Sequence, residues 1–319
     1  MALHELLAKP DTVRLGVFDA AFPEVLTVDS GDSVDIECVS GRPSVLPAPD
    51  SGLAIPPKLD AILTAYKGVN IPGHIVTGPI AIRGAMPGDM LEVRIESVEP
   101  GADWGYNAIR PLVGTLPEDF HETTISHIPV DAARGVCTLP WGTELALRPF
   151  FGVMGVAPPP AFGTISSIQP RIHGGNLDNK ELIAGSTLYL PVWAPGALFS
   201  AGDGHGVQGD GEVCVTALEM CMNGRFTFVL HKGGGLDAPL LTQPRAETPT
   251  HYISMGINED LNQAMKQALR EMIRFICERS NLSREQAYSF CSLAVDFRVT
   301  QTVNGEKGIH GMLKKGVLF

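Results

Sequence analysis

The sequence predicts a mainly β fold of the α+β class, with its helices concentrated near the C-terminal end. The 319 residues include 35 glycines and 25 prolines. Together these two residue types make up a larger share of the chain than the roughly 12% found in average proteins, which is typical of many turns and short strands. Alternating apolar and polar residues recur before residue 256, and helical spacing appears after it. A doubly wound parallel sheet is disfavoured, because it needs helices between successive strands.

The N-terminal part predicts strands joined by tight turns. Residues 12–40 alternate around a polar turn at residues 29–32, which indicates a hairpin. The clearest half-buried strand follows at Leu91, Val93 and Ile95, which alternate with charged residues. Further along, Asn223-Gly224 lies between two apolar runs, and this dipeptide favours a second hairpin.

The C-terminal part predicts two helices followed by a strand. Asn258 is a candidate N-cap for a helix whose apolar residues recur at helical spacing from Leu261 to Ile276. A second helix is expected to begin at Ser283, where Ser-x-x-Gln forms a capping-box pattern, and to end near Ala294. We divide the chain into a β-rich region at 1–150 and a second β-rich region at 151–319, which holds these helices and can be intertwined with the first.

Composition disfavours several classes of function. The chain has 24 Lys and Arg against 35 Asp and Glu, a net charge of −11. Without a basic stripe we expect no binding to nucleic acid or to anionic membranes. No apolar run approaches the ~20 residues of a membrane span, and no nucleotide-binding motif is present. The six cysteines lie far apart and no signal peptide is apparent, so we expect reduced thiols and a cytoplasmic location.

Two glycine-rich segments hold most of the side chains that can do chemistry. They read RIHGGNLD at 171–178 and GDGHGVQGDGE at 202–212. Glycine lets the backbone fold tightly around a small group. Asp203 and His205 are two residues apart and share one face of an extended backbone. With Glu212 they form a mixed nitrogen and oxygen donor set that suits Zn²⁺ or another divalent ion, and His173 with Asp178 offers the same pair of donors.

Stretches spread along the chain resemble one known family. They read HIVTGPI at 74–80, GAMPGDMLEV at 84–93, DWGYN at 103–107, PFFGVMGVAPP at 149–159, HGGNLDNKEL at 173–182, GSTLYLPV at 185–192 and GALFSAGDGHGVQGDGEV at 196–213. With the tail at 260–268 and 294–304, they make the chain similar to the acetamidase/formamidase family of amide hydrolases over nearly its whole length. The departures are small: Gly206 replaces an expected alanine, and Lys314 replaces an expected proline.

The resemblance implies a jelly-roll-like β-sandwich with a smaller α+β part. It also implies metal-dependent hydrolysis of a short linear amide, formamide or acetamide, to a carboxylate and ammonia. We therefore expect a small amide as the substrate and a homodimer or a higher even-numbered homo-oligomer. The motif match and the donor chemistry together imply metal ligands at His74, His173, Asp178, Asp203, His205 and Glu212.

A divalent metal ion suits this reaction, because it polarises a poorly electrophilic amide carbonyl and lowers the pKa of water. We expect Zn²⁺, with Ca²⁺ as the alternative. Glu212 or Asp210 is expected to relay the proton, and Asn176 to stabilise the oxyanion. Two other functions stay open: hydrolysis of a different C–N bond such as that of a γ-lactam, and a non-catalytic β-domain whose loops bind a cation.

Overall fold

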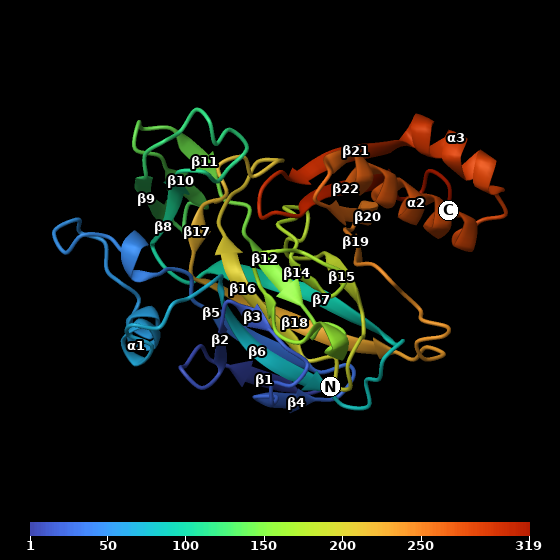
Figure 1. Ribbon diagram of the computed structural model, residues 1–319, viewed down its shortest axis with the longest axis horizontal. Coiled ribbons are helices and arrows are strands. Elements are labelled where there is room, and N and C mark those ends of the chain that lie inside the picture. The colour runs from blue at the N-terminus through green and yellow to red at the C-terminus, as the bar shows by residue number, and fades with distance from the viewer.

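A computed structural model describes residues 1–319, and it is dominated by two large β-sheets (Figure 1). The nine-stranded sheet has the order β1 (Leu3–Leu6), β5 (Ser33–Cys38), β18 (Met222–His231), β7 (Met90–Pro100), β15 (Thr187–Pro191), β19 (Arg245–Glu247), β20 (His251–Asn258), β22 (Lys307–Lys314) and β21 (Val295–Gln301). Both large sheets take strands from before and after residue 150.

The eleven-stranded sheet carries the candidate site. Its main path has the order β11 (Glu144–Ala146), β10 (Val136–Thr138), β9 (Thr124–Asp131), β8 (Trp104–Ile109), β17 (Glu219–Met220), β16 (Phe199–His205), β12 (Phe150–Gly155) and β14 (Gly174–Asn176). Beside this path, β6 (Ile75–Ile82) pairs with β16 and also with β2 (Val13–Leu15) and β4 (Leu26–Val28). A small separate sheet pairs β13 (Ile165–Ser166) with β3 (Val17–Phe18).

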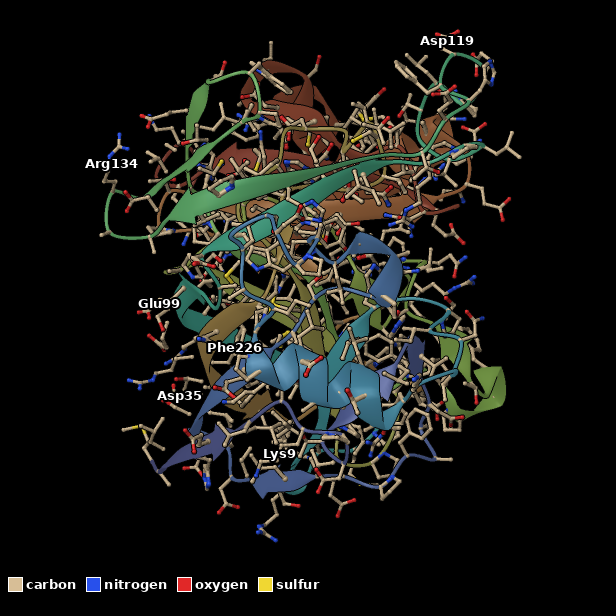
Figure 2. The ribbon with its side chains drawn as sticks, turned by 90° about the vertical axis from the view of Figure 1, so that its left-hand side faces the viewer. Lys9, Asp35, Glu99, Asp119, Arg134 and Phe226 are labelled. Carbon is tan, nitrogen blue, oxygen red and sulfur yellow. The ribbon has the colours of Figure 1, made fainter.

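The two large sheets pack against each other around one apolar core. Ile36 and Phe226 come from the nine-stranded sheet, and Phe151 and Phe199 come from the other. The rings of Phe151 and Phe226 meet edge to face with their centroids 5.3 Å apart, a favourable geometry for aromatic pairs. Charged side chains such as Asp119 and Arg134 project at the periphery (Figure 2). The predicted mainly β class is therefore confirmed.

Helices are few and lie mostly at the C-terminal end, as the sequence predicts. They are α1 (Pro57–Ala65), α2 (Leu261–Arg279) and α3 (Arg284–Ala294), and α2 packs against β20 and β22 (Figure 1). The capping box at Ser283 is present. Helix α2 begins two residues later than expected, because Asp260 rather than Asn258 accepts hydrogen bonds from its first free N–H groups. No helix of the structure has the length and apolar character that a membrane crossing needs.

Both predicted hairpins are wrong. The polar turn at residues 29–32 does connect two strands, but β4 pairs with β6 and β5 pairs with β1 and β18, so the turn joins two different sheets. Asn223 and Gly224 lie inside the continuous strand β18. A Cβ at Gly224 would lie 2.6 Å from the ring of Phe151. This glycine therefore makes room for an aromatic ring of the core and does not form a turn.

Candidate active site

The site is built around β16, which carries Asp203 and His205. Asp203 has a φ of 57°, and Asp178 and Glu212, which approach from neighbouring loops, have φ values of 45° and 42°. Residues other than glycine adopt this left-handed conformation rarely, at a cost of about 1–3 kcal/mol each. Such strained residues cluster at functional sites, and here the strained backbone directs carboxylates toward one buried point.

His205 lies at the centre of this cluster. Its Nε2 atom lies 3.2 Å from Asp203 Oδ2 and 3.3 Å from Glu219 Oε1. The imidazole has no solvent exposure, and the ring of Phe150 packs against it edge to face. Nε2 has no hydrogen-bond partner in the structure. The atom therefore has the position and the freedom that a metal ligand needs.

Gln208 determines which nitrogen of His205 is free. Its Oε1 lies 2.8 Å from His205 Nδ1, and its Nε2 donates to the backbone carbonyl of Asp178 at 2.7 Å. Because the amide nitrogen donates to a carbonyl, its oxygen accepts, and His205 Nδ1 must carry the hydrogen. A bound cation would therefore meet the lone pair on Nε2, the nitrogen that faces the carboxylates. Without a cation, burial lowers the pKa of His205 but Glu219 and Asp203 raise it well above its usual value, so that Nε2 is protonated and the ring itself carries positive charge among the carboxylates. Metal-binding histidines are commonly oriented by a partner of this kind.

Asp178 and Glu212 complete the cluster on the other side of His205. The ligand atoms of Asp178, Asp203 and His205 lie within 4.8 Å of one another, and so do those of His205, Glu212 and Glu219. Asp178 Oδ2 accepts a hydrogen bond from Asn304 Nδ2 at 2.8 Å. The other oxygen, Oδ1, and Glu212 Oε2 are buried without any partner. These unpartnered acceptors are what a divalent cation would satisfy.

The electrostatics of the cluster also favour a cation. Burial raises the pKa of the Asp178, Glu212 and Glu219 carboxyl groups, and nearby carboxylates raise it further. Asp203 differs: burial raises its pKa, but His74 and His205 lower it more, so its pKa lies below the usual range. Crowded buried carboxylates repel one another unless positive charge lies among them. The residues present therefore fit a divalent ion.

Gly152 of β12 forms the wall behind these ligands. A Cβ at this position would lie 2.6 Å from Asp178 Oδ1, 2.6 Å from Asp203 Oδ2 and 2.8 Å from His205 Cε1. No side chain larger than hydrogen fits there without displacing the cluster. The glycine thus keeps open the space in which the two acids and the imidazole meet.

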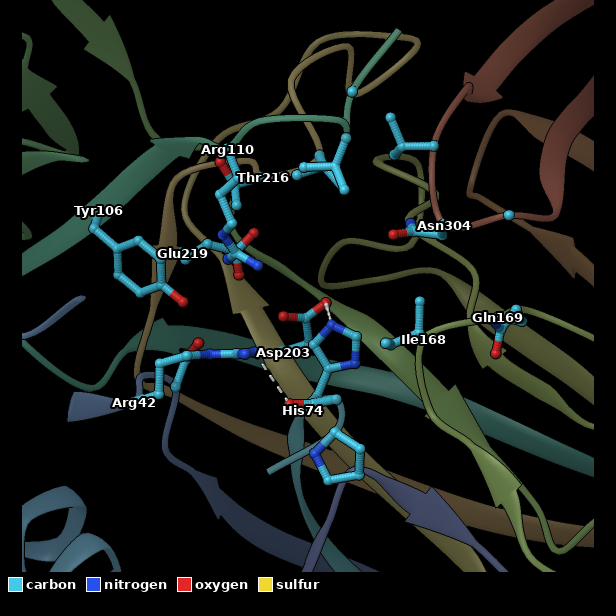
Figure 3. Close-up of a pocket in the computed structure, with 18 of the residues that line it drawn as sticks. Arg42, His74, Tyr106, Arg110, Ile168, Gln169, Asp203, Thr216, Glu219 and Asn304 are labelled. Carbon is cyan, nitrogen blue, oxygen red and sulfur yellow. Dashed lines mark hydrogen bonds and ion pairs between the residues drawn. The ribbon is translucent and has the colours of Figure 1, made fainter. Parts of the chain in front are cut away.

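A cavity of about 420 Å³ leads to one side of the cluster. His74, Asp203 and Glu219 line it, as Figure 3 shows. His74 Nε2 lies 3.6 Å from Asp203 Oδ2, and Ser167 Oγ lies 3.1 Å from His74 Nδ1. A small molecule bound in this cavity would therefore lie against Asp203 and Glu219. Glu212 lies away from it and borders a second, more apolar cavity.

The remaining residues that the sequence singled out lie outside the two metal-sized groups. His173 is buried with both ring nitrogens unpartnered, and Phe18 packs on it edge to face. Asn176 donates from Nδ2 to the carbonyl of Ile168, and its Oδ1 has no partner. Asp210 is exposed and forms an ion pair with Lys180 at 3.1 Å.

Glu219 is the residue that the sequence reasoning missed. It lies in β17, and its Oε1 accepts a hydrogen bond from the backbone N–H of Ala217. A signal existed, because Glu219 is a single acid within the apolar run from Ala217 to Met222, and carboxylates are rarely buried unless they are paired or bind a metal.

Comparison with known proteins finds similar chains and similar folds. The chain is 29% identical to the formamidase of Methylophilus methylotrophus, over 85% of this chain and 81% of that protein. The crystal structure of acetamidase from Bacillus halodurans superposes with a TM-score of 0.83 at 29% identity, covering 97% of each chain. A predicted acetamidase/formamidase from Thermoanaerobacter tengcongensis superposes with a TM-score of 0.85 at 25% identity, covering 100% of this chain and 98% of that one.

The family assignment rests on most of the chain. The model of the acetamidase/formamidase family matches residues 17–164 and 161–307, which together include both glycine-rich segments and every residue of the buried cluster. This protein therefore belongs to the acetamidase/formamidase family.

Proposed function

We propose that this protein hydrolyses a short linear primary amide to a carboxylate and ammonia with the help of a divalent metal ion. The observation that carries the proposal is the buried cluster of Asp178, Asp203, His205, Glu212 and Glu219, which has unpartnered donor atoms beside a cavity. The relatives are a formamidase and an acetamidase by name. Both act on linear amides, and the cluster provides the ligands that such chemistry can use.

Zn²⁺ is the ion we propose, because the donor set includes a histidine nitrogen among carboxylate oxygens. Ca²⁺ is less suited, since it prefers oxygen ligands alone. Asp178, Asp203 and His205 Nε2 would hold the ion, and Asp203 places it on the side that faces the cavity. A divalent ion there supplies Lewis-acid polarisation of the amide carbonyl and lowers the pKa of a water molecule.

The residues of this chain then have distinct roles in the reaction. Gln208 orients His205, and Asn304 orients Asp178. Glu219 lines the cavity, so its carboxylate accepts the proton that water loses as it adds to the carbonyl carbon. The same group returns that proton to the amide nitrogen when the C–N bond breaks. Asp210 is exposed and forms an ion pair with Lys180, so we do not assign it this role.

The other parts of the proposal rest on the sequence. We propose an even-numbered homo-oligomer because the chain resembles a family that assembles in this way. We also propose a cytoplasmic location, from the cysteine usage, and two β-rich regions that meet near residue 150 and are intertwined through the two large sheets.

Ammonia release from formamide and acetamide tests the proposal. We expect release by the purified protein, loss after prolonged treatment with a chelator, and recovery on adding Zn²⁺. Asp203→Asn should lower the rate by more than about 100-fold, because losing even a partner of a ligand costs 10–100-fold. Asp210→Asn is the matched control in the same segment and should stay near the wild-type rate. Equal rates for the two variants, or no ammonia from any amide, would refute the proposed function.

A further inference from the structure

Two arginines beside the cavity have no carboxylate partner. Arg42 precedes the short helical turn at Pro43–Val45, and Arg110 follows β8. Both are half-buried and both line the cavity that reaches Asp203 and Glu219. Arg42 makes one hydrogen bond, to the carbonyl of Gly73, and the Arg110 side chain makes none. Neither forms an ion pair in the structure.

Most other arginines of this acidic chain are paired. Arg134 and Arg225, for example, bind Glu144 and Asp35 through two nitrogens each. A half-buried guanidinium loses part of its hydration, and that loss is offset only by an anionic or polar partner. Two unpaired guanidinium groups near a cation site also weaken cation binding by repulsion. Their placement therefore indicates an anion that is absent from the protein chain itself.

The geometry of the cavity places this anion next to the reaction centre. In Figure 3 the side chains of Arg42 and Arg110 extend toward the space that His74, Asp203 and Glu219 face. The hydroxyl of Tyr106 points into the same space. This hydroxyl has no hydrogen-bond partner, although Tyr106 is buried and only 5% exposed. A carboxylate accepts from a guanidinium fork and from a phenolic hydroxyl with good geometry.

Cavity size supports a substrate larger than the smallest amides. A volume of about 420 Å³ lies within the ~300–1,000 Å³ range of pockets that hold drug-sized ligands. Formamide and acetamide would fill a small part of it. A longer molecule can reach from the cluster to the arginines.

We propose that the preferred substrate is a primary amide that also carries a carboxylate, and that Arg42 and Arg110 bind this carboxylate while the amide group lies at the His74, Asp203 and Glu219 side of the cavity. This inference rests on the proposed amidase function and adds the substrate class. It assigns to Tyr106 a hydrogen bond to the same carboxylate. The reaction itself is unchanged: water adds, the C–N bond breaks, and the product is a dicarboxylate with ammonia.

The test compares anionic amides with neutral amides of the same carbon number. Malonamate is paired with propionamide and succinamate with butyramide, and kcat/KM is measured by ammonia release. The wild type should prefer the anionic member of at least one pair. In Arg42→Met and Arg110→Met the ratio of anionic to neutral kcat/KM should fall roughly 10- to 100-fold, as expected for a hydrogen bond to a charged group. Arg134→Met, on the exposed surface, is the control and should keep the wild-type ratio.

Calorimetry with succinate and malonate separates this inference from the proposed function, because binding needs no turnover. Binding that weakens in Arg42→Met and Arg110→Met supports the anion site even if no amide is hydrolysed, in which case only the proposed function fails. Three results together would overturn the inference and leave the amidase function intact. Neutral amides would be hydrolysed as well as anionic ones, no dicarboxylate would bind, and the ratio of anionic to neutral kcat/KM would be unchanged in the arginine variants.

Discussion

Replacing Gly152 by alanine tests whether the buried cluster is the working part of the protein. The added Cβ would lie 2.6 Å from Asp178 Oδ1 and from Asp203 Oδ2. Each carboxylate must move by at least about 0.4 Å to reach 3.0 Å, the closest approach that real Cβ atoms make. Metal–ligand distances tolerate deviations of only about 0.2 Å. The substitution should therefore disrupt the ligand set while leaving the rest of the sheet in place.

The expected size of the effect separates catalysis from stability. Overpacking of this kind costs about 1–3 kcal/mol of folding free energy, which a chain of 319 residues tolerates. Misplacing reacting groups by up to an ångström lowers rates by about 100-fold. We expect Gly152→Ala to melt a few degrees lower, to retain little bound metal in elemental analysis, and to release ammonia from amides about 100-fold more slowly.

A second glycine provides the matched control. A Cβ at Gly311 would lie 2.7 Å from Phe297 Cε1 and 2.8 Å from Ser254 Oγ, so it is equally crowded, but it lies in β22 outside the cluster. Gly311→Ala should lose comparable stability and keep its metal and its rate. If Gly152→Ala folds and retains wild-type metal content and ammonia release, the reasoning that assigns the reaction to this cluster is refuted.

Two further substitutions test the supporting contacts. Gln208→Leu removes the acceptor for His205 Nδ1, so metal affinity measured by titration should fall roughly 10- to 100-fold; an unchanged affinity would contradict the orienting role. Asp89→Asn tests an ion pair between a buried carboxylate and the exposed Lys232: burial raises the pKa of Asp89, but hydrogen bonds from Lys232, Gly233 and Met86 lower it more. Because the folded pKa lies below the unfolded value near 3.9, this carboxylate stabilises the fold above about pH 4 and loses that contribution as pH falls through the folded pKa. In urea unfolding, the free energy of unfolding of the wild type should exceed that of Asp89→Asn at neutral pH, and this difference should narrow in acid. A difference that stays constant with pH would show that the ionised carboxylate contributes nothing to stability.

Elements defined by local sequence signals were the ones that the sequence predicted well. The capping box at Ser283 and the helical spacing after Leu261 depend on neighbours within one or two turns, and both helices are present. The hairpins failed because strand pairing depends on distant partners. The turn at residues 29–32 connects two sheets, and Gly224 makes room for the ring of Phe151, a residue far away in the chain.

The same distinction applies to the candidate site. The two glycine-rich segments carry recognisable donor pairs, and the structure brings Asp178, Asp203 and His205 together. Glu219 has no motif of its own, since its role comes from β17 pairing beside β16. Arg42 likewise reaches the cavity from a proline-rich segment with no pattern. Residues that join a site through sheet pairing or a long loop leave little trace in the local sequence.

Locating the metal ion in crystals by anomalous scattering at the zinc edge tests the central claim most directly. We expect a peak about 2.0–2.2 Å from His205 Nε2 and from a carboxylate oxygen of Asp178 or Asp203, in protein that releases ammonia from amides. Active protein whose ion binds elsewhere, or full activity in protein free of metal, would contradict it.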